Sequence, residues 1–390
     1  MDQNSINNVI EFMEQFANIT GLEPESTHPK RYLWTDAFAV CNYLELYNRM
    51  DEKEYLDLAL KLVDQVHHIL GKYRIDNPKI GWISGLDPYE GENHPTQAGL
   101  RIGKDLNERA PNEPFNERLE WERDGQYYHY LTKWMHSLNN TSMVTGDIKY
   151  IKWAFELAKI AQSHFTYVPH HGTRKRMYWK MSIDLKRPLV HSMGQHDPLD
   201  GYITYNEIQN GMKNLGLIES TESPLKSEIE DMKDICLGIS LITNDPLGIG
   251  GLLIDATRIT QLIMKDGLNH FELLEMVLDS SIMGLRSYIS DNPMDVPAEY
   301  RLAFRELGLS IGLKGLGIII ELIRDNHEFS IKNSLDNRFN VLKSYMDLGV
   351  IIEKFWIDEK NRKTRNWIDH RDINTVMLAT TLAPQGFLKI

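Results

Sequence analysis

The sequence predicts an all-α protein in which about twelve antiparallel helices close into an (α/α)6 toroid, and two observations point to this fold class. First, apolar residues recur at steps of three and four along segments such as 55–70 and 151–165, which is typical of amphipathic helices. Second, tight turns at 48–52, 141–147 and 243–247 join successive helical segments. Short links make neighbouring helices antiparallel, and such pairs can be repeated around a ring.

The periodic segments place the helices along the whole chain. We expect helices near 5–18, 33–48, 52–71, 124–141, 147–165, 199–214, 225–242, 250–264, 270–288, 298–323, 333–356 and 373–382. A weak echo links the helices that follow Asp51 and Asp147, which suggests stacked hairpins, although two independent helices with similar start signals would look the same. No linker divides the chain, so a single domain over 1–390 is expected.

One segment has the period of a β-strand instead. Between Met177 and Leu185 apolar and other residues alternate after Tyr178, which predicts a strand with one buried face. We expect a small β-hairpin near 173–187, inserted between helices.

Composition excludes several partners. Forty-three basic residues against 55 acidic ones give a net charge of −12, so most of the surface would repel a phosphate backbone and we expect no nucleic acid partner. The most apolar segment, 307–323, is interrupted by Lys314 and Glu321, which favours a buried helix over a membrane span. Two cysteines, no zinc-motif spacing and no secretory signal predict a cytoplasmic protein.

Loop lengths predict where the functional site lies. Helices joined by short links alternate in direction, so every second helix, starting with the one near 33–48, begins at the same face. The two longest connections, 72–123 and 166–198, fall at that face as well. Loops gathered at one end of a rigid scaffold commonly carry binding and catalytic residues, and we expect the site there.

Carboxylates, imidazoles and indoles gather at these helix starts. The candidate catalytic residues are Asp36, Asp124, His191 and His196. The candidate substrate-binding residues are Trp34, Trp82, Trp121, Asp197, Trp367, His370 and Arg371. Paired carboxylates suit glycosidic chemistry, and flat aromatic faces suit sugar rings. In this hypothesis Asp36 and Asp124 serve as acid and base.

The helical plan resembles that of the six-hairpin glycosidase-like superfamily, whose members are (α/α)6 toroids. The motifs Trp34-Thr35-Asp36-Ala37-Phe38 and Arg123-Asp124-Gly125-Gln126-Tyr127 are similar to those of unsaturated glucuronyl and rhamnogalacturonyl hydrolases. Those enzymes place one aspartate near the start of an early inner helix and another at an Asp-Gly-type helix start. The resemblance implies a glycoside hydrolase acting on an oligosaccharide or a modified sugar. We expect neither a metal ion nor a cofactor.

Each candidate also has a purely structural explanation. An aspartate at a helix start, such as Asp36 or Asp124, can cap the helix and oppose its dipole. His191, His196 and Asp197 could form a capped loop, or alternatively ligate zinc. The run 366–374 could be a salt-bridged loop that closes the ring.

Two further functions compete with hydrolysis. The same kind of ring hosts sugar epimerases, which work mainly through histidines, so a sugar isomerase or epimerase is the first alternative. A non-catalytic helical binding protein is the second, and it would carry a flat, apolar end face without convergent acids.

Overall fold

The computed structural model describes residues 3–266, 270–324 and 333–390, which are mostly α-helical. The chain divides into two compact units, one formed by Met1–Ile19 with Ser240–Ile390 (unit 1) and the other by Thr20–Ile239 (unit 2). Each unit is described by itself below. The single domain expected over 1–390 stays a prediction.

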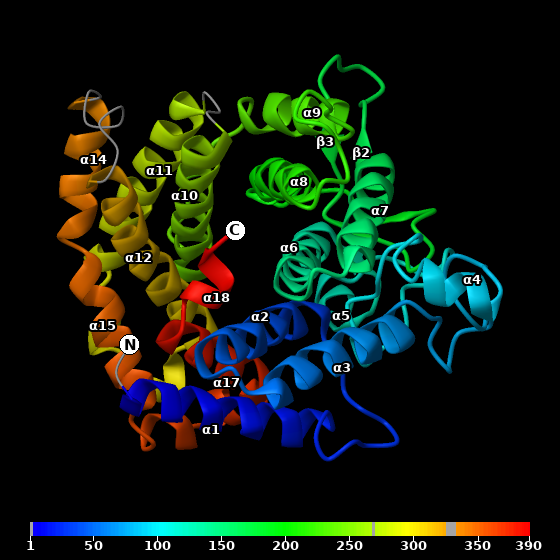
Figure 1. The fold of residues 1–390 in the computed structure, drawn as a ribbon, viewed down its shortest axis with the longest axis horizontal. Helices are drawn as coiled ribbons and strands as arrows, with labels where there is room; N and C mark the ends of the chain where they lie inside the picture. Colours follow the sequence, from blue (N-terminus) through cyan, green and yellow to red (C-terminus); the bar gives the residue numbers. More distant parts are fainter. Residues whose placement is uncertain (1–2, 267–269, 325–332) are drawn as a thin grey trace. The chain divides into compact units, whose positions relative to one another are not determined.

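Unit 2 is built from three helical hairpins (Figure 1). These are α2 (Leu33–Met50) with α3 (Lys53–Leu70), α6 (Tyr128–Thr145) with α7 (Ile148–Phe165), and α8 (Asp197–Asn214) with α9 (Lys226–Cys236). Between hairpins, α2 packs on α6 and α6 packs on α8. Every residue of α2 from Leu33 to Leu46 is buried, whereas α3 buries only one stripe. The helices α2, α6 and α8 therefore form the inside of the unit.

Local backbone signals set the tight turns of these hairpins. The chain leaves α2 through Asp51 and leaves α6 through Gly146, both in the left-handed region with φ of 57° and 72°. A left-handed residue after a helix closes its last turn and reverses the chain. Asp147 then accepts a hydrogen bond from Lys149 N at 3.0 Å and caps α7. The predicted turns at 48–52 and 141–147 are confirmed.

Two small sheets confirm that the second long connection contains β-structure, but the single strand predicted from Met177 to Leu185 is wrong, because the chain turns between Met181 and Pro188 and Leu185 has a left-handed φ of 58°. The strands β1 (Gln126–Tyr127), β4 (Lys180–Met181) and β5 (Pro188–Val190) form an antiparallel sheet in the order β1-β4-β5, and β2 (Thr166–Tyr167) pairs with β3 (Arg176–Met177). The alternating pattern predicted one exposed face, but Lys180 on that face is buried. Its ammonium donates to the carbonyls of Glu120 and Arg123 at 2.6 and 2.8 Å, which satisfies the charge.

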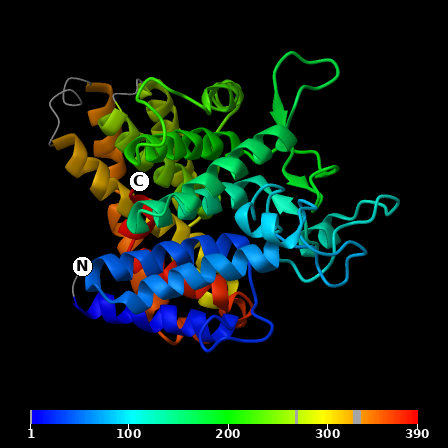
Figure 2. The same ribbon diagram turned by 45° about the vertical axis from the view of Figure 1, so that its right-hand side comes forward.

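The first long connection, between α3 and α6, contains the short helices α4 (Pro88–Asn93) and α5 (Glu117–Glu122). The pairing of β1 with β4 brings the end of this connection beside the loop between α7 and α8. Figure 2 shows the cyan loops of the first connection and the green loops of the second extending from the same end of unit 2. This is the clustering of long loops that the alternation of helix directions predicted.

Unit 1 is also helical. Its long helices α10 (Pro246–Asp266), α11 (Phe271–Ser290) and α12 (Ala303–Arg324) are followed by α14 (Asn333–Lys343), α15 (Met346–Ile357), α16 (Arg365–Asp369), α17 (Arg371–Leu382) and α18 (Gln385–Leu388), and α1 (Gln3–Thr20) lies at the other end of the chain. α12 packs against α10, α15 and α17. A Cβ added at Gly250 would lie 2.2 Å from the carbonyl oxygen of Gly308, so glycine is what allows α10 and α12 to approach so closely.

Several predicted boundaries differ from the structure. The helix expected over 333–356 is two helices, because the chain turns at 344–345. The helix expected to begin at 124 begins at Tyr128, because residues 126–127 pair in β1. Among the described residues, one helical segment, Pro246–Lys265, has the length and apolar character of a membrane span, and 78% of its window is buried inside the protein.

Candidate functional site

The predicted acid Asp36 lies in the first turn of α2 and is 1% exposed. Its carboxylate accepts a hydrogen bond from the backbone N–H of Tyr32 at 2.8 Å, and it forms an ion pair with Arg31 at 3.5 Å. A carboxylate in this position satisfies an open N–H at the helix start and opposes the helix dipole. The structure thus places Asp36 where the capping alternative puts it.

The second predicted acid, Asp124, precedes α6 and is fully buried. One carboxylate oxygen accepts from the backbone N–H groups of Gly103 and Gly125, each at 3.0 Å, and the other pairs with the Arg101 guanidinium. Arg74 adds a second cation at 3.6 Å. These bonds tie the loop after α3 to the start of α6, so Asp124 is a structural anchor with no open face for a sugar.

Two side-chain contacts connect the first turns of α6 and α8. His129 Nδ1 lies 3.4 Å from Asp197 Oδ1, and Lys133 Nζ lies 2.6 Å from Asp200 Oδ1. His129 and Lys133 are one helical turn apart, as are Asp197 and Asp200, so the two pairs lie in register on facing helices. Asp197 and Asp200 are 4% and 8% exposed.

The two pairs differ in how well they are satisfied. Lys133 and Asp200 form a direct hydrogen bond. By contrast, neither His129 Nδ1 nor Asp197 Oδ2 has a hydrogen-bond partner among the described residues, although both atoms are buried. A buried polar atom without a partner costs free energy, and such atoms commonly await a ligand or a bound water. The pair His129–Asp197 therefore has one buried atom without a partner on each of its two side chains.

Aromatic side chains surround the His129–Asp197 pair. The Tyr127 ring stacks on His129 at 5.3 Å, and Tyr130 meets His129 edge-on at 4.9 Å. Trp179 lies 5.4 Å from Tyr127, and the exposed ring of Trp121 lies 4.9 Å from Trp179. Rings in this arrangement offer both flat apolar faces and polar edges, which is what a sugar ring packs against.

Lys104 and two tyrosines add polar groups beside these rings. The hydroxyls of Tyr32 and Tyr130 are 2.6 Å apart, and the Lys104 ammonium lies 5.4 Å above the Tyr32 ring. Burial lowers the pKa of Lys104, because water no longer stabilises the charged form. Among the described residues its ammonium has no carboxylate partner, so it can meet a ligand's oxygen atoms.

The other predicted residues of unit 2 lie in varied surroundings. Trp34 and Trp82 are buried, Trp34 against Phe38 and Trp82 under the Lys72 ammonium, so neither offers a free face to a sugar. His191 is exposed and meets the Tyr178 ring at 5.5 Å.

His196 is half-buried at the residue before α8, where the capped-loop alternative places it. Of all the predicted residues, Asp197 and Trp121 are the ones that lie within the cluster described here.

Three predicted substrate-binding residues belong to unit 1. Trp367 is buried and stacks on Trp356 at 5.6 Å. The His370 ring bonds to the backbone carbonyl of Asn366 at 3.0 Å, and Arg371 is exposed at the start of α17. In that unit they form the loop that precedes α17.

No group of three or more histidine, cysteine or carboxylate side chains is arranged to hold a metal ion in the described part of the chain. The alternative that His191, His196 and Asp197 ligate zinc therefore receives no support from the geometry. Both cysteines, Cys41 and Cys236, are buried free thiols.

Sequence reasoning missed His129 and Lys133. His129 lies in the stretch Gln126-Tyr127-Tyr128-His129-Tyr130, which follows Asp124-Gly125, and Lys133 lies one helical turn further on. The available signal was a basic side chain that recurs after one turn at a helix start. The aspartate at the helix start is the more conspicuous local pattern, and it hides the basic residues of the next turn.

Comparison of the whole chain with known proteins identifies the fold. No family model matches the sequence, and no curated protein does either. A solved GH76A α-1,6-mannanase of Salegentibacter sp. HEL1_6, in complex with an α-1,6-linked mannotetraose, superposes with a TM-score of 0.55 over 97% of this chain and 99% of its own, at 12% identity. The chain has the (α/α)6-toroid fold.

Two further structures describe the range of this likeness. A GH76 α-mannanase of Bacteroides thetaiotaomicron gives a TM-score of 0.53 at 7% identity, over 97% of this chain and 96% of its own. A cellobiose 2-epimerase of Spirochaeta thermophila gives 0.47 at 11% identity, over 96% and 98%. The predicted fold class, an (α/α)6 toroid, is confirmed by the likeness to the two mannanases.

One difference from the Salegentibacter mannanase concerns its acids. The variant that was solved is inactive and has two adjacent aspartates replaced by alanine. The present sequence contains no two adjacent aspartates anywhere. Its aspartates at the helix starts are instead Asp36 in α2, Asp124 before α6, and Asp197 and Asp200 in α8.

Proposed function

We propose that this protein is a carbohydrate-active enzyme that binds an oligosaccharide or a modified sugar over the first turns of α6 and α8 and hydrolyses a glycosidic bond there. The observation that carries the proposal is the His129–Asp197 pair. His129 Nδ1 lies 3.4 Å from Asp197 Oδ1, and both His129 Nδ1 and Asp197 Oδ2 are buried without a hydrogen-bond partner among the described residues. Aromatic rings surround the pair. The likeness to mannanases supports the fold on which such a site would sit.

The spacing of Asp197 and Asp200 supports hydrolysis by two carboxylates. Side chains three residues apart on a helix lie on one face, with about 5–6 Å between their Cβ atoms. Retaining glycosidases separate their carboxyl groups by about 5–5.5 Å, whereas inverting enzymes need about 6.5–9.5 Å to admit a water molecule. The pair Asp197–Asp200 offers two carboxyl groups on one face of α8, and we propose that they act by the retaining mechanism.

In this mechanism the two aspartates have different roles. Asp200, held by Lys133, attacks the anomeric carbon as the glycosidic C–O bond breaks, and Asp197 passes its proton to the leaving oxygen. Water then attacks the same carbon, gives one proton back to Asp197 and releases Asp200. His129, beside Asp197, orients that carboxyl group. The aromatic rings of Tyr127 and Trp179 exclude water and pack against the sugar.

The originally expected acid and base have a supporting role in this proposal. Asp36 and Asp124 are paired with arginines and buried, so they hold the starts of α2 and α6 in place instead of contacting the sugar. We further propose that the protein acts in the cytoplasm, where its buried free thiols, Cys41 and Cys236, stay reduced.

A second candidate is a sugar epimerase or isomerase. The His129–Asp197 pair itself favours it, because a carboxylate that orients an imidazole makes a general base able to remove a proton from a carbon next to a carbonyl. In that case the substrate mass would not change and no glycosidic bond would break.

Product analysis in labelled water separates the candidates. A pool of neutral and acidic oligosaccharides is incubated with the protein in water enriched in oxygen-18, and the masses of the products are measured by mass spectrometry. Shorter products that carry one heavy oxygen at the reducing end support hydrolysis. Products that have the mass of the substrate in ordinary water, and that take up deuterium when the reaction is run in heavy water, support epimerisation. An untouched pool, with the protein folded, contradicts both.

A further inference from the structure

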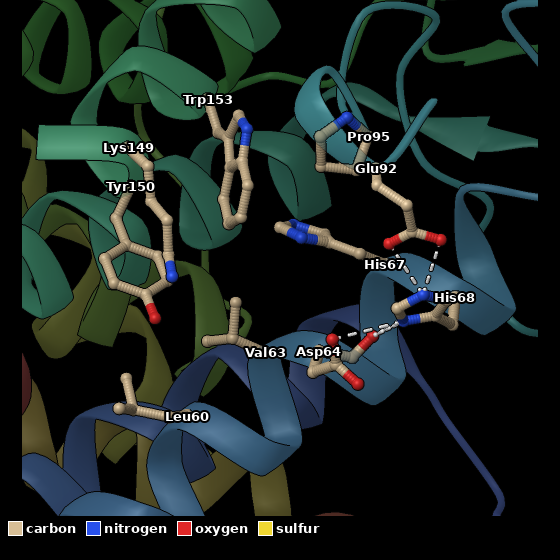
Figure 3. A pocket seen from close by; sticks show the side chains of 10 residues that line it. All are labelled: Leu60, Val63, Asp64, His67, His68, Glu92, Pro95, Lys149, Tyr150 and Trp153. Carbon is tan, nitrogen blue, oxygen red and sulfur yellow. Dashed lines mark hydrogen bonds and ion pairs between the residues drawn. The ribbon is translucent and has the colours of Figure 1, made fainter. Parts of the chain in front are cut away.

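A pocket of about 330 Å³, its open mouth included, lies within unit 2 between α3, α7 and the segment that follows α4. Figure 3 shows the side chains that line it. They are Leu60, Val63, Asp64, His67, His68, Glu92, Pro95, Lys149, Tyr150 and Trp153. None of these residues belongs to the His129–Asp197 cluster, so the pocket is a separate feature of the unit.

The floor of the pocket is His67, whose protonation state follows from its neighbour. The indole N–H of Trp134 donates to His67 Nε2 at 3.1 Å. An indole nitrogen can only donate, so Nε2 carries no hydrogen. Burial also lowers the pKa of His67 to about 3, so the ring is neutral at physiological pH. The single ring proton of His67 is therefore on Nδ1.

This Nδ1–H group is an unused donor. His67 is 3% exposed, and in the part of unit 2 that the structure describes its only hydrogen bond is the one from Trp134. Figure 3 shows the ring projecting into the space between Trp153 and Val63. A donor held in a buried, fixed ring and facing a pocket calls for an acceptor oxygen on whatever enters.

The wall beside His67 is flat and apolar. The Trp153 ring meets His67 edge-on at 4.9 Å, and its own N–H is fixed by the carbonyl of Asn93 at 2.8 Å. Tyr150 lies edge-on to Trp153 at 5.4 Å. Because the indole is held in one orientation before any ligand arrives, its face can receive a ring without a loss of side-chain entropy.

The charges at the mouth of the pocket are already paired. His68 contacts Asp64 at 3.3 Å and Glu92 at 2.8 Å, and Lys149 contacts Asp147 at 3.2 Å. His68 is thus paired with two carboxylates and Lys149 with a third. Neither cation among these five residues is left unpaired for an anionic ligand. The carboxylate oxygens can still accept hydrogen bonds from hydroxyl groups.

We propose that this pocket is a second sugar-binding site, which holds one neutral pyranose ring with a hydroxyl oxygen on His67 Nδ1–H and an apolar face on Trp153. The choice of a sugar among hydroxylated ligands rests on the proposed function, whereas the need for a neutral ligand with an acceptor oxygen rests on the pocket. Trp134 follows Lys133 on α6 but points about 100° away from it, so the second site would hold part of an oligosaccharide on another side of that helix.

The site is tested by titrating two neutral probes, methyl α-D-mannopyranoside and methyl β-D-glucopyranoside, into the full-length protein carrying Asp197→Asn, which prevents turnover. The imidazole nitrogens of His67 are followed by proton–nitrogen NMR. We expect a saturable shift of the Nδ1–H signal with at least one probe. Methyl β-D-glucuronide serves as the charged comparison, and tighter binding of this anion than of both neutral probes would contradict the proposal.

Matched variants distinguish the loss of the His67 hydrogen-bond donor from a loss of folding. His67→Gln keeps an oxygen that can accept the Trp134 N–H but removes the Nδ1–H donor. Binding to this variant is followed through the indole N–H signal of Trp153, and it should be about tenfold weaker. Trp153→Leu should weaken binding by a similar factor, about tenfold, through loss of the stacking face. His129→Ala should leave binding at the pocket unchanged.

Failure of this proposal can be told apart from failure of the proposed function. Unaltered sugar affinity in a folded His67→Gln protein, or no saturable shift with any probe, would overturn the second site even if the wild-type protein cleaves oligosaccharides. Saturable binding that depends on His67 in a protein without any turnover would keep the second site and remove the proposed reaction.

Discussion

The Nδ1 atom of His129 lies 3.4 Å from the Oδ1 atom of Asp197, and the neighbouring Lys133 and Asp200 are joined by a bond of 2.6 Å. The two pairs lie one helical turn apart on α6 and α8. One is a closed ion pair and the other has unsatisfied atoms on both partners. This asymmetry distinguishes Asp197, which has an oxygen without a partner, from Asp200, which Lys133 holds in a fixed position.

Replacing Asp124 should unfold the protein rather than alter its chemistry. Asp124→Ala removes the partner of the buried Arg101 and the acceptor of two backbone N–H groups, so the free energy of unfolding should fall by about 3–5 kcal/mol. Denaturant unfolding followed by circular dichroism measures it. The exposed Asp105 provides the control, because Asp105→Ala should change stability by less than about 0.5 kcal/mol. Equal stability of the two variants would contradict the anchoring role.

The half-buried Trp179 should contribute to substrate binding. Trp179 packs on Tyr127 and on the exposed Trp121, so Trp179→Ala removes the centre of the aromatic rim and should raise KM about tenfold with a smaller change in kcat. Steady-state kinetics on the cleaved oligosaccharide tests this. Trp34→Phe, at a buried ring packed on Phe38, serves as the comparison and should leave KM within about twofold.

The protein should lose stability at alkaline pH through His68. The hydrogen bonds to Asp64 and Glu92 raise the pKa of His68 from 6.5 to about 9, so the folded state holds the proton more tightly than the unfolded state. The stabilisation is fully present below pH 6.5 and is lost as the pH rises through about 9. Melting temperatures between these values should fall less in His68→Gln than in the wild type. Parallel curves for the two proteins would contradict this.

His67 should act in the opposite direction at acid pH. Burial lowers the pKa of His67 from 6.5 to about 3. Between these two pH values the imidazole is therefore protonated in the unfolded state but neutral in the folded state. The wild type should therefore lose stability as the pH falls below 6.5. His67→Gln cannot titrate and should show a shallower loss. The exposed His28, changed to Gln, is the matched control and should follow the wild type.

The fold could be predicted from the sequence because its determinants are local. Helical periodicity and the left-handed residues Asp51 and Gly146 define hairpins without any information from distant residues. The alternating direction of the helices then placed the long loops at one end. Helix ends were less predictable, since the start of α6 depends on Gln126 pairing with Met181, which is distant in the sequence.

The site was predictable only in part. Asp197 and Trp121 were selected for residue type and position, and both lie in the aromatic cluster. Asp36 and Asp124 were selected on the same grounds, yet each is held by an arginine that no local pattern connects to it, Arg31 and Arg101. Whether an acid at a helix start is open or paired depends on these tertiary partners, and so cannot be read from spacing.

The most direct test of the account is a comparison of turnover in Asp197→Asn with the wild type, on whichever oligosaccharide the labelled-water screen shows to be cleaved. We predict a loss of at least about a thousandfold in kcat with an unchanged melting temperature, because Asp197 is the proton donor and its contact with His129, which is not a hydrogen bond, contributes little to folding. Full activity in a folded Asp197→Asn protein would contradict the assignment of the site to the first turns of α6 and α8.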